Sequence, residues 1–204
     1  MSKTELSPDW RESRRQSARA AILEAAWAAV RDEGLAALSL RDLARRAGIT
    51  TPTVYAYFES KNSIYDAMFG QAAAGFERTM GGPYDVGAPR EVLVASLRRF
   101  IEFCTADIPR YQLLFQRTIP GFRPSPESYE PAVRALVHAR EVLALNGATR
   151  DRQLDLWTAL TIGLVDQQIA NEPGGDRWVR LSDDLVTMFL TYCNPPKAAR
   201  KDRK

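Results

Sequence analysis

The segment 50–58 carries hydroxyl and phenol groups on a stretch short enough to form one small helix. Val54 and Phe58 are four residues apart and would face inward, which leaves the polar and aromatic side chains facing outward or obliquely. Such side chains are good partners for phosphate oxygens, base edges and thymine methyl groups in DNA. The residues predicted to contact bases are Thr51, Pro52, Thr53, Ala56 and Tyr57, and Tyr55 is predicted to contact a phosphate.

Positive side chains flank this segment on both sides. Arg41, Arg45 and Arg46 precede it. Lys61 follows Ser60 and opens the next expected helix, whose N-terminus itself favours a phosphate. We predict phosphate contacts from Arg41, Arg45 and Lys61. The alternative is a small helical packing unit whose polar side only faces water.

A first short helix is expected directly before the segment. Its apolar residues recur at spacings of three and four and share one face. Ser39 can cap the free N–H groups of this helix, with Asp42 as an imperfect capping-box partner. The apolar residues of this face are Leu40, Leu43, Ala44 and Ala47.

A tight turn is expected between the two helices. Gly48 can adopt a positive φ, which ends the first helix and turns the chain. Thr50 or Thr51 then caps the second helix, and Pro52 fits its first turn, where no backbone N–H is needed. Two short helices joined in this way form a helix-turn-helix unit, whose second helix enters the major groove of DNA.

The run 14–69 resembles the DNA-binding domain of TetR-family transcriptional regulators. The pattern Thr-Val-Tyr-x-Tyr-Phe-x-x-Lys at 53–61, after an Ala-Gly turn at 47–48, is highly specific for this family. The resemblance covers about a quarter of the chain and implies an all-α protein that binds double-stranded DNA as a homodimer. Further matching residues are Ile22, Ala25, Ala26, Gly34, Leu38, Ser39, Leu43, Ala44 and Ile64.

The predicted fold is all-α, in three parts. Residues 10–60 form the DNA-binding domain, with the helix-turn-helix at about 39–58. A connecting helix follows at 61–82, and 83–196 form a helical ligand-binding and dimerisation domain. The helix-breaking residues Gly-Gly-Pro at 81–83 separate the last two parts. In the body, one helix is expected to begin at 87–89 and end at about 107, and a second is expected to begin at 109. Further helices are expected at about 127–146, 150–171 and 176–193.

The first helix is expected to end at Gly34 and to carry basic residues at its start. Its inward face is predicted at Ala21, Ile22, Ala25, Ala29 and Val30. Arginine at a helix N-terminus is electrostatically unfavourable, which suggests contact with the DNA backbone rather than only a solvated helix start. The arginines concerned are Arg11, Arg14, Arg15 and Arg19.

The last two long helices carry more apolar surface than a one-sided helix needs. The resemblance implies that they form the dimer interface, and that a two-fold dimer reads a palindromic operator. The alternative is that all this surface is intramolecular core. The predicted interface residues are Leu154, Leu160, Leu164, Leu181, Leu185 and Phe189.

The body is rich in aromatic residues, and the resemblance implies that some line a cavity for a small hydrophobic effector. Ligand binding would move the two DNA-binding heads out of register with DNA and relieve repression. For any single aromatic residue the alternative is a place in the core. The predicted ligand residues are Phe100, Phe103, Tyr111, Phe115, Trp157 and Gln168.

Composition fits this interpretation. The formal charge of +3 and the pI near 9.0 make DNA binding depend on a local basic face. The single His138 has no nucleophile fixed near it, and no catalytic, metal or cofactor motif is recognisable. We therefore predict that the protein is not an enzyme and binds no metal or cofactor.

Without a signal peptide or membrane span, a cytoplasmic protein is predicted. An activator, a ligand-independent regulator, or a regulator sensing oxidation through Cys104 or Cys193 remain alternatives.

Overall fold

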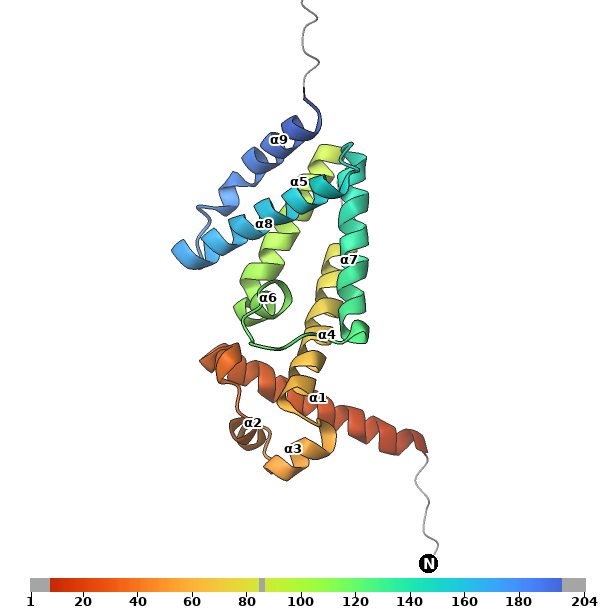
Figure 1. The fold of residues 1–204 in the computed structure, drawn as a ribbon, viewed down its shortest axis with the longest axis vertical. Coiled ribbons are helices and arrows are strands. Elements are labelled where there is room, and N and C mark those ends of the chain that lie inside the picture. Colours follow the sequence, from red (N-terminus) through yellow and green to blue (C-terminus); the bar gives the residue numbers. More distant parts are fainter. Residues whose placement is uncertain (1–7, 85–86, 196–204) are drawn as a thin grey trace, which may run out of the picture. The chain divides into compact units, whose positions relative to one another are not determined.

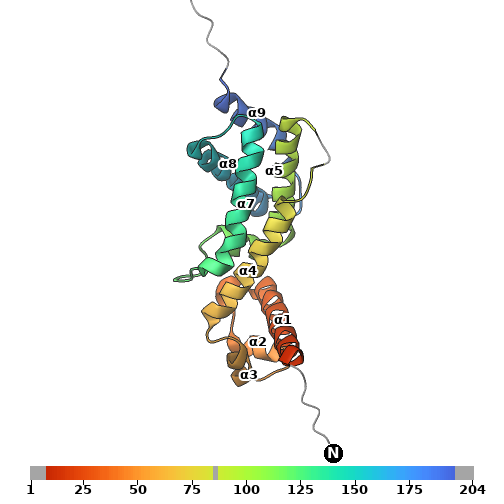
Figure 2. The ribbon, with the colours of Figure 1, turned by 90° about the vertical axis from the view of Figure 1, so that its right-hand side faces the viewer.

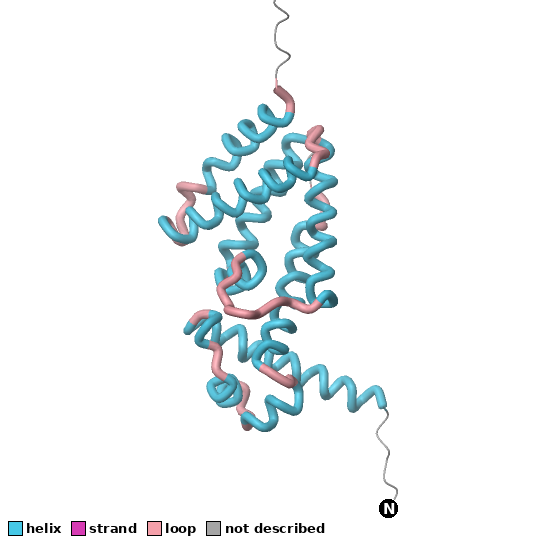
Figure 3. Tube along the Cα trace, viewed as in Figure 1, coloured by secondary structure: helices cyan, strands magenta, loops and turns pink. Residues whose placement is uncertain are grey.

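The computed structural model describes residues 8–84 and 87–195, and these form helices and loops without any strand (Figures 1 and 3). The all-α fold predicted from sequence is confirmed. No helix in this part of the chain is both long and apolar enough to span a bilayer. The α-helices are α1 (Pro8–Glu33), α2 (Leu40–Arg46), α3 (Thr51–Tyr57), α4 (Lys61–Met80), α5 (Pro89–Ala106), α6 (Ile108–Phe115), α7 (Pro126–Leu145), α8 (Asp151–Asn171) and α9 (Ser182–Cys193).

The helices divide into two compact units. Among the described residues, the first unit runs to Ala73 and adds Pro109–Glu130, and the second combines Ala74–Ile108 with the chain from Pro131 onward. The helices α4 and α7 therefore contribute to both units. The predicted functional division at 10–60, 61–82 and 83–196 remains a prediction, and its last residue, 196, lies outside the described residues.

The first unit begins with three helices that pack on one another, with α2 and α3 against α1 (Figure 2). The buried face of α1 is wider than predicted. Ala21 is exposed and Ala25 is only half-buried, whereas Leu23, Ala26 and Trp27 are buried. A helix packed on several partners buries more than one stripe of residues, so its periodicity alone does not define the inward face.

The second unit has its core between α5, α8 and α9, which contact one another. The ring of Trp157 on α8 lies 4.9 Å, between centroids, from the ring of Phe189 on α9. Leu97 and Ile101 of α5 are buried in the same unit. This packing uses apolar residues of the last two helices inside a single chain.

The last helix begins later than predicted. Instead of a helix from 176, the chain forms a loop and a 3₁₀ turn at Val179–Leu181, and α9 starts at Ser182. The buried side chain of Gln168 holds this loop: its amide oxygen accepts from the backbone N–H groups of Trp178 (3.0 Å) and Val179 (3.3 Å). Its amide nitrogen donates to the carbonyl of Gly175 at 3.0 Å. These bonds satisfy backbone groups that a helix would otherwise pair internally.

Candidate nucleic-acid interface

The turn between α2 and α3 closes with the hydrogen bonds of a Schellman motif. The N–H of Ile49 donates to the carbonyl of Ala44 at 3.0 Å, and the N–H of Gly48 donates to that of Arg45 at 3.2 Å. Gly48 has φ +66°, the left-handed conformation that a side chain disfavours. The turn predicted at Gly48 is thus present and fixes the direction in which α3 leaves α2.

The α3 helix is capped at its start and anchored on one face. Thr50, not Thr51, is the N-cap, and its hydroxyl accepts from the N–H of Thr53 at 3.3 Å. Val54 and Phe58 are buried as predicted. The opposite face is open, and Tyr55 has 52% of its surface exposed. Pro52 and Ala56 are exposed, whereas Thr51, Thr53 and Tyr57 are half-buried.

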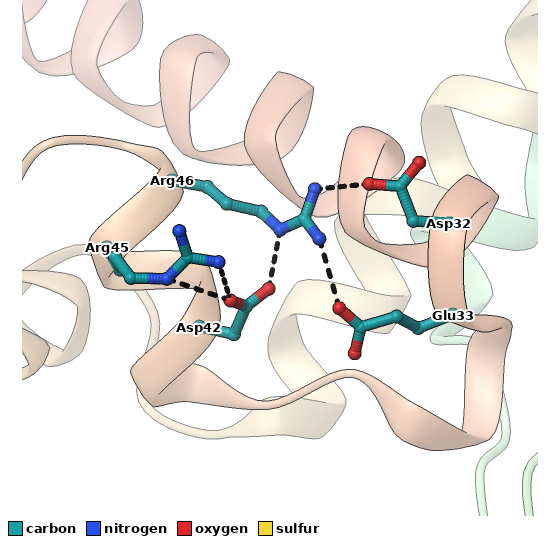
Figure 4. Close-up of polar contacts among 5 residues, drawn as sticks. All are labelled: Asp32, Glu33, Asp42, Arg45 and Arg46. Carbon is teal, nitrogen blue, oxygen red and sulfur yellow. Dashed lines mark hydrogen bonds and ion pairs between the residues drawn. The ribbon is translucent and has the colours of Figure 1, made fainter.

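The start of α2 differs from the prediction. Ser39 occupies the N-cap position, but its side chain makes no capping hydrogen bond. Asp42 is not a capping-box partner, because its carboxylate binds the guanidinium groups of Arg46 and Arg45 (Figure 4). Hydrogen bonds from Arg46 and then Arg45 hold the pKa of this carboxyl below its ordinary value.

Arg46 has a structural role, in contrast to the free positive charge expected from sequence. Its Nη1 lies 2.5 Å from a carboxylate oxygen of Asp32, and its Nη2 lies 3.0 Å from one of Glu33, both at the end of α1 (Figure 4). Together with Asp42, these acids neutralise Arg46 and join α2 to α1. Arg45 has 71% of its side chain exposed, and Arg41 makes no ion pair within the described residues, so these two remain available to phosphates.

Arg19 of α1 holds the far end of α3. Its Nη1 donates to the carbonyl of Tyr57 at 2.6 Å, and its guanidinium lies 4.3 Å from the ring centroid of Phe58. The carbonyl belongs to the last residue of α3 and has no partner within that helix. Arg19 therefore positions α3 from a helix distant in sequence.

We expect Arg19→Met to lower the free energy of unfolding by about 1–2 kcal/mol, because it removes a hydrogen bond from a charged donor and a cation–π contact. Urea unfolding followed by circular dichroism measures this change. Arg15→Met is the matched control, since Arg15 is exposed on the same helix. Equal stability of the two variants would contradict the positioning role.

A shallow groove lies between the start of α1 and α3. It is lined by three arginines of α1 and by residues of α3, and no carboxylate lines it. The guanidinium of Arg14 lies 4.6 Å from the ring centroid of Trp10, which supports it at the groove's edge. Trp10 and Ala18 are the lining residues that no sequence pattern indicated. The lining residues are Trp10, Arg11, Arg14, Arg15, Ala18, Pro52, Thr53, Ala56 and Tyr57.

The helix-turn-helix region matches the family described as "Bacterial regulatory proteins, tetR family", over residues 22–68. The match includes the Schellman turn, α3 and the start of α4. Residues 22–68 thus resemble the DNA-binding domain of TetR-family regulators. A relative from Mycobacterium bovis, named as an uncharacterised HTH-type transcriptional regulator, is 27% identical over 137 residues, which is 66% of this chain and 62% of that protein. The chain thus matches less than two thirds of the length of this curated relative.

Solved structures of transcriptional regulators share the fold, and the first of the two below is named as a TetR-family protein. PfmR from Thermus thermophilus is 21% identical, with a TM-score of 0.61 over 83% of this chain and 96% of that one. FadR from Bacillus subtilis, solved in complex with stearoyl-CoA, is 16% identical, with a TM-score of 0.62 over 84% and 97%. At these identities the likeness shows the fold alone.

The start of α4 completes the helix-turn-helix domain at residues 22–68, which is called the head below. Ser60 and Ser63 form a reciprocal capping box, each hydroxyl accepting from the other residue's N–H at 3.1 Å. Lys61 is half-buried, with its ammonium 3.4 Å from the carbonyl of Ala36 and 5.5 Å from the ring centroid of Tyr65. Lys61, which was predicted to contact a phosphate, therefore has neutral partners, and no ion pair within residues 8–84 and 87–195 compensates its charge.

The ligand residues predicted from the sequence belong to both units. Phe103 contacts Phe76 at 5.1 Å between ring centroids, and Phe100 contacts it at 6.0 Å, in the second unit. Trp157 packs in the core of that unit, and the amide of Gln168 is used by the loop before α9. Tyr111 and Phe115 belong to the first unit, where their rings contact each other at 5.6 Å.

The predicted dimer residues fall into three classes of exposure. Leu154, Leu164 and Phe189 are buried within the single chain, and Leu160 and Leu185 are half-buried. Leu181 has 41% of its surface exposed. The sequence did not single out Met188 and Tyr192 of α9, which are 66% and 48% exposed.

Proposed function

We propose that this chain is a homodimeric, sequence-specific repressor of the TetR family that acts in the cytoplasm and is released from a palindromic operator by a small hydrophobic ligand. One observation carries the DNA-binding part: α3 is anchored from beneath by Val54 and Phe58, and its open face borders a groove lined by arginines without carboxylates. The exposed phenol of Tyr55 and methyl group of Ala56, with the half-buried hydroxyl of Thr53 and guanidinium groups beside them, suit base edges and phosphates.

The aromatic content of the chain and one structural neighbour support release by a ligand. FadR from Bacillus subtilis has a similar fold and was solved with stearoyl-CoA, a ligand with a long apolar chain. A repressor responds to such a ligand when its DNA-bound and ligand-bound conformations differ in free energy.

The alternatives are an activator, a ligand-independent regulator and a redox-responsive regulator. Burial raises the pKa of the Cys104 thiol, and the Asp166 carboxylate raises it further. Burial also raises the pKa of Cys193. Because the thiolate is the form that reacts with oxidants, both thiols are poorly suited to sensing. These observations favour a ligand over oxidation as the signal.

For the dimer, we propose that the exposed apolar side chains of α9 and of the turn before it form the contact. Leu181, Met188 and Tyr192 are the residues concerned, in place of those that the chain buries in its own core. We expect Met188→Glu/Tyr192→Glu to be monomeric at micromolar concentration, because each dimer would bury four new carboxylates. Size-exclusion chromatography with light scattering measures the mass. A variant that remains dimeric would place the interface elsewhere.

The decisive experiment for DNA binding is selection of a site from random duplexes, followed by fluorescence anisotropy in a salt titration. Sub-micromolar binding to a palindromic site, with a steep salt dependence and no competition by random DNA, is the expected result. Equal and weak binding to every sequence would refute the proposal.

A further inference from the structure

A pocket of about 420 Å³ lies within the first unit, under the loop that joins α6 to α7. Its walls come from α4, from the end of α6, from the loop and from the start of α7. Two of its aromatic rings, those of Phe69 and Tyr129, stack at 5.9 Å between centroids. The pocket's volume is within the usual range for a small-molecule site. Its apolar wall residues are Phe69, Leu113, Leu114, Phe115, Ile119, Pro120, Phe122, Pro124 and Tyr129.

The charged side chains that line this pocket are all positive. Arg117 and Arg123 belong to the loop, both are exposed, and no aspartate or glutamate lines the pocket. Neither arginine has an ion-pair partner among residues 8–84 and 87–195, in contrast to Arg46 in the head. Two uncompensated guanidinium groups beside apolar walls favour an anion with an apolar body, because a guanidinium binds a carboxylate or sulfonate with charge-assisted hydrogen bonds.

The pocket has a direct packing connection to the DNA-binding head. The wall residue Phe122 contacts Tyr65 of α4, with 5.7 Å between ring centroids. The buried Tyr65 hydroxyl donates to the carbonyl of Leu35, in the turn between α1 and α2. The ring of Tyr65 also contacts Lys61, whose ammonium lies 5.5 Å from the ring centroid. A change at Phe122 therefore reaches residues that position the head.

A second contact ties the pocket loop to α4. The carboxylate of Asp66 accepts from the backbone N–H of Ser125 at 2.6 Å and from its hydroxyl at 2.9 Å. It also accepts from the hydroxyl of Ser128 at 2.9 Å. These bonds fix the end of the loop on α4, so displacement of the loop by a ligand is resisted at one end and transmitted to this helix.

We propose that this pocket is the effector site, that it binds an amphiphilic organic anion with its charged group between Arg117 and Arg123, and that occupancy weakens DNA binding. The assignment rests on the proposed ligand-controlled repressor. In this proposal the effector is negatively charged and binds within the first unit. Of the six ligand residues named in the sequence analysis, Phe115 lines this pocket and the other five do not.

The first arm of the test measures binding of two fluorescent probes to the full-length protein. The anion 8-anilinonaphthalene-1-sulfonate and the neutral N-phenyl-1-naphthylamine share the same rings and differ in the sulfonate. We expect the anion to bind at least about tenfold more tightly. Arg117→Gln/Arg123→Gln should remove this preference and leave the affinity for the neutral probe unchanged, which also shows that the pocket is intact.

The matched control for charge is Arg152→Gln/Arg180→Gln, which removes two exposed arginines from the second unit. It should keep the preference for the anion. A wild-type protein without preference, or a control that loses it as fully as the pocket variant, would overturn the assignment.

The second arm repeats the DNA anisotropy measurement while the anionic probe is titrated. DNA should dissociate over the concentrations at which the probe binds the wild type and the control, and the pocket variant should need at least about tenfold more probe for the same dissociation. Probe binding without any effect on DNA would overturn the effector role. Absence of DNA binding by every sample, without probe, would instead refute the proposed function, and the first arm would still decide whether the pocket binds anions.

Discussion

Ala56→Glu is expected to weaken binding to the selected DNA site by at least about 100-fold, which corresponds to about 2.7 kcal/mol. Ala56 is exposed on α3 and lines the groove between α3 and α1. A carboxylate there would face phosphates at close range, and juxtaposed like charges cost several kcal/mol at an interface. It would also face the groove arginines and compete with DNA for them. Fluorescence anisotropy at fixed salt measures the affinity.

The fold should tolerate this substitution. Glutamate is a good helix former, and an acid in the last turn of a helix costs less than about 1 kcal/mol. Ala144→Glu is the matched control, because Ala144 is an exposed alanine of α7 and gives the same change in net charge. If both variants lost affinity equally, net charge rather than the face of α3 would govern binding.

The turn after α2 and the α3 helix could be predicted because their interactions are local. Gly48, Thr50 and Pro52 each act on backbone groups within five residues, so the order of residue types already contains the geometry. Where two local solutions compete, prediction becomes less certain. The carboxylate of Asp42 could accept a capping hydrogen bond or bind arginines. In the structure it binds Arg46 and Arg45, and the side chain of Ser39 makes no capping hydrogen bond.

The contacts that position the site could not be predicted, because they join residues far apart in sequence. Arg19 and Tyr57 are 38 residues apart, and Asp66 and Ser125 are 59 apart. A single sequence shows that an arginine is present but not which carbonyl it will meet. The late start of α9 also depends on a contact outside the helix, because the amide of Gln168 on α8 stabilises a loop where a helix was predicted.

The apolar surface of the last two helices illustrates a related limit. Sequence periodicity identified Leu164 and Phe189 as members of broad apolar faces, and both are buried in the single chain. Periodicity measures how much of a helix is apolar, not whether its partner belongs to the same chain or to a second copy. Only exposure in the folded chain separates the two, which is why the proposed contact moves to residues such as Met188.

Trp27→Ala is expected to lower the free energy of unfolding by about 3–5 kcal/mol, the largest loss of stability that we predict for the first unit. Trp27 is fully buried on α1. Its indole N–H donates to the side-chain oxygen of Gln71 on α4 at 2.9 Å, and the guanidinium of Arg110 on α6 lies 5.0 Å from its ring centroid. Truncation would leave a cavity beside three helices and unpair Gln71. Urea unfolding followed by circular dichroism measures the loss.

Two further variants separate the contributions of Trp27. Trp27→Phe retains most of the ring and loses the hydrogen bond, so it should cost less than the alanine variant. Trp10→Ala removes the same side chain from an exposed position of the same helix and should change stability by less than about 1 kcal/mol. If Trp10→Ala were as destabilising as Trp27→Ala, burial of Trp27 would not be what holds α1 to α4 and α6. In that case the groove arginines of α1 would not be fixed beside α3 by this core.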